Sequence, residues 1–336
     1  MAGRTFKLTV AAAAALIAAG AGVASAAVAT SGQGPGCEGP QLTGAATPQL
    51  VLHTPQSLSV TVSLTDNCPG LRLAHTVLYL TGPQGWTVMP AGAQPVADLQ
   101  PGGHDTVTWQ VQVPAGASGG GLKAQAIYDV GPHSTNSTVG SVTAAVAFPS
   151  QAAALDNAGV TNDGDTGPGN LDGSGYSFSA QALAAAGVTP GSTVTAGGVA
   201  FTWPDAAAGV QDNIVASGQA ILLNGAGSTL GFLVTGTYGT ASGTGTIDYT
   251  DGTTQSFTLT APDWYATPPA GSDPAITTAY RNTPGNGKDQ HPVVVYDVSV
   301  PLQAGKTIEA VILPDVSPSP PTAGVTALHV FAIGIG

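Results

Sequence analysis

The sequence contains few charged residues, and basic residues are the scarcest. Only 8% of the 336 residues are charged, whereas a soluble domain usually carries about 25%. Long solvated helices are normally covered with Glu, Lys and Arg, so this composition argues against a helical protein. The chain has seven basic residues against 19 acidic ones. Because an acidic surface repels phosphate groups and anionic lipid, we expect no nucleic acid and no membrane surface as partner.

Long hydrophobic runs are absent from most of the sequence, and the exception lies at the N-terminus. Residues 1–26 contain two basic residues, then an apolar stretch that begins at Leu8, and they end in Ala24-Ser25-Ala26. This pattern is typical of a secretory signal peptide with an A-x-A cleavage site. The alternative, a membrane anchor, needs about 20 apolar residues, and this run is shorter. We therefore expect a secreted, extracellular protein.

Cysteine is also rare, with only Cys37 and Cys68 in the chain. Both lie in the part expected to be exported, and an even number of cysteines in an oxidising compartment favours a disulfide. Such a bond would stabilise the fold by roughly 3–4 kcal/mol and tie the segment around Cys37 to the first domain. The alternative, a pair of catalytic thiols, lacks both C-x-x-C spacing and a nearby histidine.

Short runs that alternate between apolar and polar residues begin near residue 46. In the clearest run, Leu58, Val60, Val62 and Leu64 share one face, as in a half-buried strand. Strands are predicted for residues 58–64, 76–80, 86–88, 107–113, 123–128 and 139–148. This number and spacing predict an immunoglobulin-like β-sandwich over residues 46–148, preceded by a flexible leader at residues 27–45.

A second and larger β region follows a short linker at residues 149–154. Strands are predicted for residues 199–203, 219–223, 229–234, 243–249, 254–260, 292–300, 307–313 and 326–333. Asp251-Gly252 lies between two of these runs and indicates a hairpin. One helix is predicted at residues 179–186, with Gly187 as its stop signal. Residues 155–336 are therefore predicted to form a jelly-roll-like β-sandwich, so the fold class is all-β.

The first sandwich carries three sequence strings that resemble a known module. They are Pro83-x-Gly85-Trp86-x-Val88, Leu99-x-Pro101-Gly102 and Val107-Thr108-Trp109-x-Val111. Over residues 46–148 these strings resemble the NPCBM-associated domain of α-galactosidase type, a sandwich module that accompanies secreted glycosidases. The sequence departs from that family at Asp66-Asn67-Cys68-Pro69, where the family has an Asn and a Gly in a plain turn.

The second half also carries strings that resemble a known domain. They include Asn170-x-Asp172-Gly173-x-Gly175-Tyr176-Ser177, Gly198-Val199-x-Phe201-Thr202-Trp203-Pro204, Asp263-Trp264-Tyr265, Tyr280-Arg281-Asn282 and His329-Val330-Phe331. In this order they are similar to the C-terminal β-rich accessory domain of secreted actinobacterial glycosidases. In those proteins a separate domain performs hydrolysis. The two resemblances imply an accessory role, with an extracellular polysaccharide or glycoconjugate and a secreted glycosidase as partners.

Glutamate is too rare to supply the carboxyl pair of a typical glycosidase. Hydrolysis of a glycosidic bond generally needs two carboxyl groups, and the chain has only Glu38 and Glu309. A pair of aspartates, for example Asp263 with Asp289, stays open as an alternative to turn and strand-end roles. The six histidines are dispersed without the spacing of zinc ligands. We therefore assign no catalytic residue.

An acidic and glycine-rich stretch near residue 165 suggests calcium. Asp163, Asp165, Asp172 and Asn170 could supply the hard oxygen ligands that Ca²⁺ prefers. The order of an EF-hand loop is absent, because no Glu closes the loop. The alternative role of these residues is to cap turns and strands in contact with solvent.

Aromatic residues offer a candidate carbohydrate-binding platform in the second half. The candidates are Trp264, Tyr265 and Tyr280, because an aromatic face can pack against the C–H groups of a sugar ring. Trp264 and Tyr265 lie outside clear strand alternation, and the alternative role of these two is packing between sheets or domains. Trp203 shares a strand face with Phe201 and is expected in the core. The primary hypothesis is thus a secreted, non-catalytic, carbohydrate-binding or glycosidase-associated protein. An Asp-dependent glycoside hydrolase and a structural spacer without ligand are the alternatives.

Overall fold

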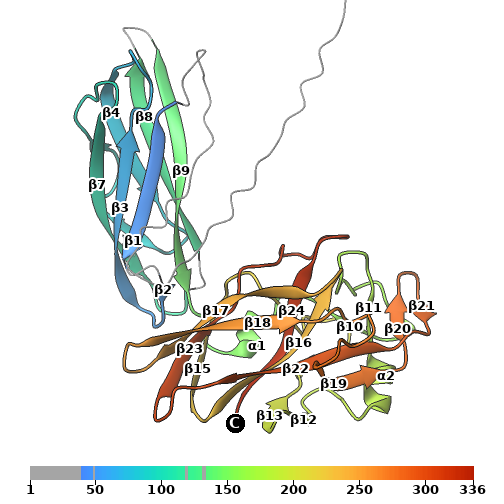
Figure 1. Cartoon of the computed structure of the whole chain (residues 1–336). Helices are drawn as coiled ribbons and strands as arrows, with labels where there is room; N and C mark the ends of the chain where they lie inside the picture. The colour runs from blue at the N-terminus through green and yellow to red at the C-terminus, as the bar shows by residue number, and fades with distance from the viewer. Residues whose placement is uncertain (1–38, 48–49, 118–119, 131–133) are drawn as a thin grey trace, which may run out of the picture. The chain divides into compact units, whose positions relative to one another are not determined.

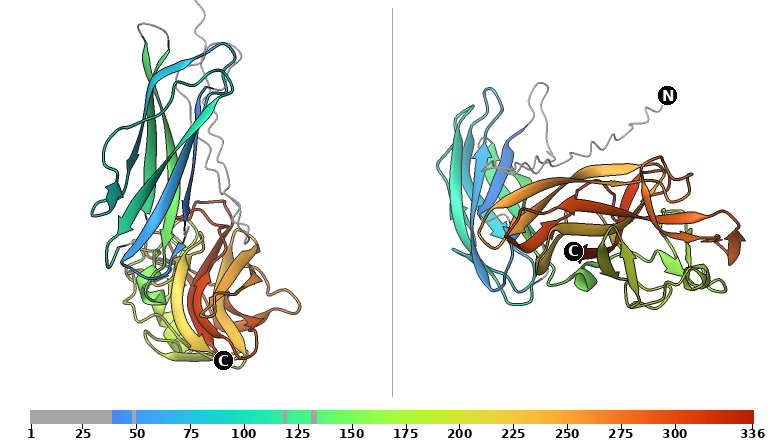
Figure 2. Two further views of the ribbon diagram at one scale, coloured as in Figure 1. Left: turned by 90° about the vertical axis from the view of Figure 1, so that its left-hand side faces the viewer. Right: turned by 60° about the horizontal axis from the view of Figure 1, so that its bottom comes forward.

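The structure is a computed structural model that describes residues 39–47, 50–117, 120–130 and 134–336. The chain divides into two compact units; the first ends at Val146 and the second comprises Ala147–Gly336. Strands dominate both units, as Figure 1 and the two further views of Figure 2 show. The predicted all-β fold class is therefore confirmed. Residues 1–26, the expected signal peptide, lie outside the described residues. Within the described ranges, no helix has both the length and the apolar character needed to cross a membrane.

The first unit is a sandwich of two sheets. One sheet has the strand order β1-β3-β7-β5 and the other the order β2-β9-β8-β4-β6. The strands are β1 (Gln41–Thr47), β2 (Leu50–Val51), β3 (Gln56–Thr65), β4 (Leu73–Thr81), β5 (Thr87–Met89), β6 (Gln94–Pro95), β7 (His104–Val113), β8 (Gly120–Val130) and β9 (Thr135–Val146). The apolar face predicted for β3 is confirmed, since its four alternating aliphatic residues are all buried. Trp109 of β7 is also fully buried in this core.

Strand β1 begins inside the segment predicted to be a flexible leader. Its residues pair in an unbroken register with β3, from Gln41 opposite Thr65 to Thr47 opposite Ser59. Leu42 is buried, and a Cβ atom added at Gly44 would lie 2.3 Å from a methyl carbon of Val142. The small residues that made this segment look loose are therefore what allows it to pack tightly as a strand. The leader prediction is wrong for residues 41–45.

The second unit contains two larger sheets and several short strand pairs. The five-stranded sheet has the order β14-β24-β16-β22-β19, and the four-stranded sheet the order β15-β23-β17-β18. Their strands are β14 (Ile214–Val215), β15 (Ala220–Ala226), β16 (Thr229–Thr237), β17 (Ala241–Tyr249), β18 (Thr254–Ala261), β19 (Asp273–Thr278), β22 (Val293–Pro301), β23 (Thr307–Ile312) and β24 (Ala327–Ile335). Successive strands cross repeatedly from one sheet to the other, and one core cluster of the unit lies between the two sheets. A second core cluster contains Phe178, Trp203, Trp264 and Phe331.

Short strands at one end of the second unit position the site described below. They are β10 (Val160–Thr161), β11 (Ser177–Ser179), β20 (Arg281–Thr283) and β21 (Gly287–Asp289), which form one small sheet, and the pair β12 (Thr193–Ala196) and β13 (Val199–Thr202). The pattern of the sequence did not predict β10, β11, β20 or β21, because strands of two or three residues have no detectable alternation.

The predicted helix and hairpin are both present. Helix α2 (Ala180–Ala185) begins after Ser179, whose hydroxyl accepts a hydrogen bond from the main-chain nitrogen of Ala182. It ends before Gly187, which has a φ of +86°, a conformation that favours glycine at a helix end. Gly252 turns the chain between β17 and β18, which pair along their whole length.

The segment predicted to be a linker is part of the second unit. Residues Gln151–Ala154 form the short helix α1, and Ala154 is buried in the core between the two large sheets. The side-chain amide of Gln151 donates to the carbonyl oxygen of Phe331, and its oxygen accepts from the main-chain nitrogen of Ile333. These contacts tie the segment to β24 within the second unit.

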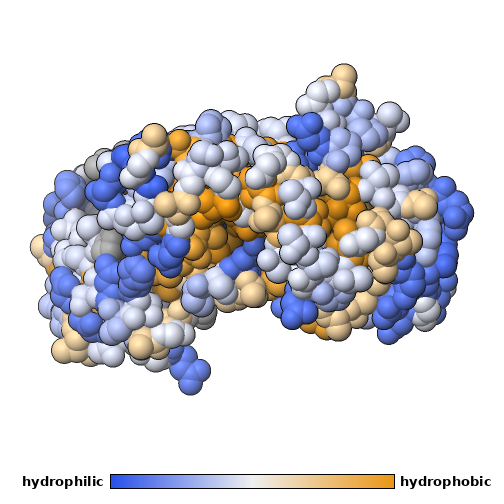
Figure 3. All heavy atoms as spheres, turned by 90° about the horizontal axis from the view of Figure 1, so that it is seen from below, coloured by the Kyte–Doolittle hydropathy of each residue, from blue (hydrophilic) through white to orange (hydrophobic). Residues whose placement is uncertain are grey.

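The surface reflects the scarcity of charge. In the face shown in Figure 3, hydrophobic residues reach the surface between hydrophilic ones. Large exposed apolar side chains of the described residues include Met89, Val139, Val210 and Val325. A protein with 8% charged residues cannot cover its surface with charge, so exposed apolar atoms are expected.

Candidate functional site

One polar cluster of the second unit is built around Arg281. The hairpin of β20 and β21 pairs Arg281 with Asp289, and the Arg281 Nε atom lies 3.0 Å from an Asp289 carboxylate oxygen. Two tyrosine rings flank the guanidinium group, whose Cζ atom lies 4.2 Å from the ring centroid of Tyr176 and 3.9 Å from that of Tyr265. Such cation–π contacts hold an arginine in one orientation while its charge is paired.

A second planar group lies on Tyr265. The rings of Tyr265 and His291 are stacked, with centroids 4.0 Å apart and an angle of 28° between their planes. Two planar groups cannot both lie this close to one ring centroid on the same face without overlapping. Arg281 and His291 therefore cover opposite faces of Tyr265. We call the resulting layers of Tyr176, Arg281, Tyr265 and His291 the Arg281 stack.

Trp264 lies beneath the Arg281 stack and is not a surface platform. Its side chain is only 2% exposed. Its ring lies 5.0 Å from that of Phe178, and the Arg281 guanidinium lies 5.2 Å away. The expectation that Trp264 presents a face to ligand is therefore corrected: its large apolar area is buried in the core, and it supports Arg281 from below.

Tyr280 belongs to a neighbouring cluster centred on Asp163. The Tyr280 hydroxyl donates to Asp163 at 2.8 Å, the Lys288 ammonium lies 2.6 Å from the same carboxylate, and the Ser179 hydroxyl also donates to it. The Lys288 ammonium in addition lies 4.7 Å from the Tyr280 ring centroid. Partial burial opposes ionisation of Asp163, but the hydrogen bonds from Lys288, Ser179 and Tyr280 outweigh it and lower its pKa. The hydrogen bond to Asp163 raises the pKa of Lys288.

The four residues predicted to bind calcium are held by separate local partners. Asp163 is paired with Lys288, while Asp172 accepts hydrogen bonds from the main-chain nitrogens of Ser174 and Tyr176. Asn170 accepts from the main-chain nitrogen of Gly175. The main chain of Asp165 forms a β-bridge with that of Asn162. Among the described residues, no three or more His, Cys, Asp or Glu side chains are placed to hold a metal ion. In the described part of the chain, the three aspartates therefore do not form one cluster of metal ligands.

Asp263 and Asp289, the aspartates considered as a catalytic pair, also have separate partners. Asp263 accepts hydrogen bonds from the main-chain nitrogens of Gly239 and Tyr265, which is a turn role. Asp289 is paired with Arg281.

Only one of the two cysteines of the predicted disulfide lies within the described residues. Cys37 lies outside the described residues. Cys68 is buried, its main-chain nitrogen donates to Asp66, and there is no free cysteine in the described part of the chain. The pairing of Cys37 with Cys68 stays a prediction.

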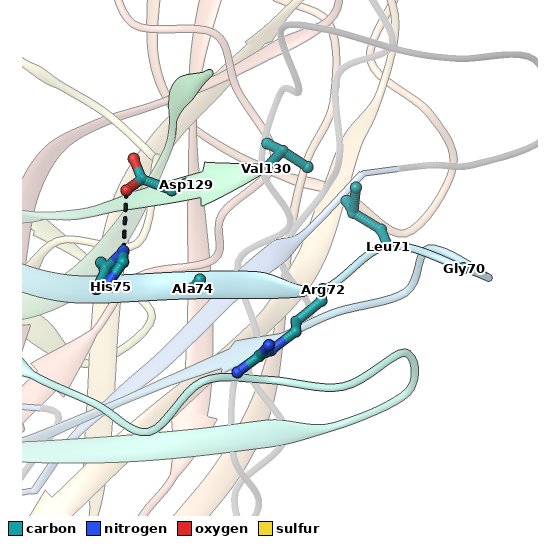
Figure 4. Close-up of a pocket in the computed structure, with 7 residues that line it drawn as sticks. All are labelled: Gly70, Leu71, Arg72, Ala74, His75, Asp129 and Val130. Atoms are coloured by element: carbon teal, nitrogen blue, oxygen red, sulfur yellow. Dashed lines mark hydrogen bonds and ion pairs between the residues drawn. The ribbon is translucent and has the colours of Figure 1, made fainter. Parts of the chain in front are cut away.

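The first unit has a pocket of about 550 Å³ at one end of β4 and β8. Figure 4 shows its lining, in which the side chains of His75 and Asp129 point toward one another. The His75 Nδ1 atom lies 3.1 Å from the Asp129 carboxylate, and Arg72 pairs with Asp98 at 2.7 Å. Hydrogen bonds from Thr135 and His75 lower the pKa of Asp129.

These polar groups hold an irregular piece of backbone. His75 has a φ of +49° and lies where the register of β4 and β8 shifts, a bulge that a non-glycine residue rarely adopts without support. Asp98 accepts the main-chain hydrogen bond of His75 at 3.0 Å. The side chain of His75 is 84% exposed. The pocket is therefore an open surface feature of mixed polarity whose charged groups are already paired.

Sequence reasoning missed several residues of the cluster in the second unit. It singled out Tyr265 and Tyr280, but Tyr176, Arg281 and His291 were not assigned to a site. One signal was present: Arg281 is one of only seven basic residues in the chain, and a rare cation beside aromatic residues deserves consideration as a binding group.

The fold and the cluster define an all-β protein of two units with a charge-paired, aromatic-rich surface on the second. Residues 150–318 match the family described as AziU2-like beta-sandwich domain, which covers half of the chain. The chain belongs to this family. Residues 55–130 match the family described as NPCBM-associated, NEW3 domain of alpha-galactosidase. This match confirms the resemblance of the first half of the chain to that module.

Two solved structures show a distant likeness to this chain. The GAE domain of GGA2p from Saccharomyces cerevisiae is 13% identical with a TM-score of 0.24, and the match covers 36% of this chain and 96% of that chain. The secreted serine protease VesC from Vibrio cholerae is 10% identical with a TM-score of 0.25, and the match covers 84% of this chain and 48% of the protease. These scores are too low to support any argument. No curated protein matches the chain.

Proposed function

We propose that the protein is a secreted, non-catalytic accessory protein whose second unit binds carbohydrate at the Arg281 stack. The observation that carries this proposal is the layering of Tyr176, Arg281, Tyr265 and His291, with Tyr265 37% exposed. A rigid planar face packs against the C–H groups of a sugar ring, and polar groups beside it fix the hydroxyls.

The charge balance of the surface favours a neutral sugar. Arg281 is paired with Asp289, and Lys288 is paired with Asp163. Each pair offers hydrogen-bond donors and acceptors side by side, which suits hydroxyl groups because a hydroxyl both donates and accepts. Since each cation is already neutralised by a carboxylate, an anionic sugar would gain little here.

We infer from the stacking which side chain a sugar ring would contact. Both faces of Tyr265 are covered, one by Arg281 and the other by His291. A sugar ring would therefore pack on the outer face of His291 and reach the exposed edge and hydroxyl of Tyr265. Tyr280 would contribute from the neighbouring Asp163 cluster.

An association with a glycosidase is supported by the first unit. Residues 55–130 match a family whose description links it to α-galactosidase, and residues 1–26 have the pattern of a signal peptide. The proposed partners are an extracellular polysaccharide or glycoconjugate and a secreted glycosidase. Mass spectrometry of the protein from the culture medium should give a chain that begins at Ala27.

Retention on insoluble polysaccharides tests the binding proposal. We expect the wild type to be retained on at least one neutral polysaccharide, and the variants Tyr265→Ala and His291→Ala to lose about 10-fold or more in affinity. The matched control Tyr265→Phe keeps the ring and its stacking and should retain most of the binding. Met89→Ala, which changes an exposed residue of the first unit, should bind as the wild type does. Equal retention of wild type and His291→Ala, or no retention of any of them, would refute the proposal.

A further inference from the structure

A small cavity in the second unit lies apart from the Arg281 stack. Its volume is about 130 Å³, and it lies between helix α2 and the segment 203–212. The side chains of Leu183, Val188 and Trp203 are buried and form apolar walls. Ala184 and Thr189 are exposed and mark the opening. A ligand can therefore enter from solvent into a mostly apolar chamber.

The wall of this cavity contains one carboxyl group, that of Asp212. Asp212 is only 3% exposed. One carboxylate oxygen accepts from the main-chain nitrogen of Gly159 at 2.9 Å and from the side-chain amide of Asn213 at 2.8 Å. The other accepts from the main-chain nitrogen of Val160 at 2.8 Å. The group is thus fixed in one position by three donors.

The hydrogen bonds of Asp212 leave room for one more donor. Each carboxylate oxygen can accept two hydrogen bonds. The oxygen bonded to Gly159 and Asn213 is saturated, whereas the oxygen bonded to Val160 has accepted only one. Of the other lining residues, Thr189 carries a hydroxyl group and Trp203 an indole N–H, which can donate but not accept. A ligand in the cavity therefore meets one carboxylate acceptor and mostly apolar walls.

We propose that this cavity binds a small primary ammonium compound with a compact alkyl body, held by an ion pair to Asp212. The size fits, because a cavity of roughly 150 Å³ in another protein accommodates benzene. A cation is favoured over a neutral alcohol since a buried carboxylate without a counter-charge is costly and an ammonium group compensates it. In agreement with this, burial raises the pKa of Asp212 to about 7. The acidic chain, with a net charge of −12, also attracts cations.

Binding of cyclopentylamine, measured by two-dimensional NMR and by calorimetry on the full mature chain at pH 8, tests this proposal. We expect saturable binding, with the resonances of α2 and of residues 203–212 perturbed. Cyclopentanol should bind about 10-fold or more weakly, and cyclopentanecarboxylate should not bind, because only the ammonium group supplies a charged hydrogen bond.

Three variants locate the binding site. Asp212→Asn should weaken cyclopentylamine about 10-fold or more and bring its affinity close to that of cyclopentanol. Ala184→Leu, on the exposed rim, should fill the opening and weaken both compounds without touching Asp212. Ala185→Leu is the matched control, since Ala185 is exposed on the same helix but does not line the cavity, and it should bind as the wild type does.

If Asp212→Asn does not fold, the affinity of Ala184→Leu for cyclopentylamine still tests the proposal. Equal affinity of wild type and Ala184→Leu for cyclopentylamine would show that the amine binds elsewhere on the acidic surface and would overturn the proposal. The absence of saturable binding to the wild type would overturn it as well. Neither result bears on retention by polysaccharides, which depends on the Arg281 stack.

Discussion

Trp264 and Tyr265 are neighbours in the sequence but lie in opposite environments. The ring of Trp264 is 2% exposed, whereas Tyr265 is 37% exposed. The main-chain nitrogen of Trp264 donates to Gly236 at 2.9 Å, and its carbonyl oxygen accepts from Val294 at 3.0 Å. These bonds fix Trp264 between β16 and β22, so its ring points into the core and that of Tyr265 faces solvent.

The two residues should therefore differ sharply in their effect on stability. Trp264→Ala removes a buried aromatic side chain and should lower the free energy of unfolding by about 3–5 kcal/mol. Tyr265→Ala removes a partly exposed ring and should cost about 1 kcal/mol. Urea denaturation followed by circular dichroism measures both values. Similar losses for the two variants would contradict the assignment of Trp264 to the core.

Gly173 is required by both conformation and space. Its φ is +76°, and a Cβ atom at this position would lie 2.4 Å from the main-chain nitrogen of Ala323. Gly252 has a similar φ of +80° with open space around it. Gly252→Ala should therefore cost only the conformational energy, roughly 1–2 kcal/mol, and Gly173→Ala should cost about 3 kcal/mol or more, because it adds a clash with backbone. Thermal unfolding of both variants would reveal the difference, and equal melting temperatures would contradict the packing around residue 173.

His329 should make the fold sensitive to acid. Complete burial lowers its pKa from 6.5 to about 3, so the unfolded chain takes up a proton at a higher pH than the folded chain does. This contribution to stability is fully present above pH 6.5 and is lost as the pH falls toward 3. His329→Gln removes it. The difference in unfolding free energy between wild type and His329→Gln should thus shrink by about 1 kcal/mol or more between pH 7 and pH 5.

Asp212 contributes to the pH dependence of stability with the opposite sign to His329. Burial raises the pKa of Asp212 from 3.8 to about 7, and the corresponding stabilisation is present below pH 3.8 and lost as the pH rises to 7. Because Asp212 is present in wild type and variant alike, its own contribution cancels in the difference, apart from the coupling through Asn213, which is hydrogen-bonded to both Asp212 and His329. A constant difference for His329→Gln would refute the prediction.

Calcium should leave the stability of the protein unchanged. Lys288, Ser179 and Tyr280 already occupy the carboxylate of Asp163, so a cation would have to displace them. We expect equal melting temperatures in calcium and in chelator. Asp163→Asn should lower stability by about 1 kcal/mol, as expected for a partly exposed ion pair. A rise in melting temperature with calcium that Asp163→Asn abolishes would show that the loop does bind the ion.

A disulfide between Cys37 and Cys68 should be detectable by mass spectrometry of unreduced peptides. Its reduction should lower the free energy of unfolding by roughly 3–4 kcal/mol. The double variant Cys37→Ser/Cys68→Ser should lose a similar amount and should not respond to reductant. Two alkylatable thiols in the secreted protein would contradict the pairing.

Much of the fold could be predicted because a long strand shows a local alternation of apolar and polar residues. Leu58, Val60, Val62 and Leu64 alternate with polar residues, and all four are buried. The alternation holds because neighbouring side chains of a strand point to opposite faces. Strand β1 was missed because Gly44 and Ala46 carry too little apolar surface to reveal that they pack against the core.

The candidate site was only partly predictable. Trp264, Tyr265 and Tyr280 were all candidates for the platform, and for Trp264 and Tyr265 the sequence left packing between sheets open as the alternative. Nothing local distinguishes Trp264 from Tyr265. Their difference arises from hydrogen bonds to Gly236 and Val294, which lie about 30 residues away on either side and meet Trp264 only in the folded sheet.

The sequence by itself determined the all-β class, most strands of both units and the acidic character of the chain, because these follow from composition and from the spacing of near neighbours. Only the tertiary structure decided which polar groups meet. Tyr176, Tyr265 and Arg281 come from three separate segments, as do Val160, Leu183 and Asp212 around the cavity. The physical reason is that such contacts depend on strand register and on the packing of sheets, which couple residues far apart in the chain.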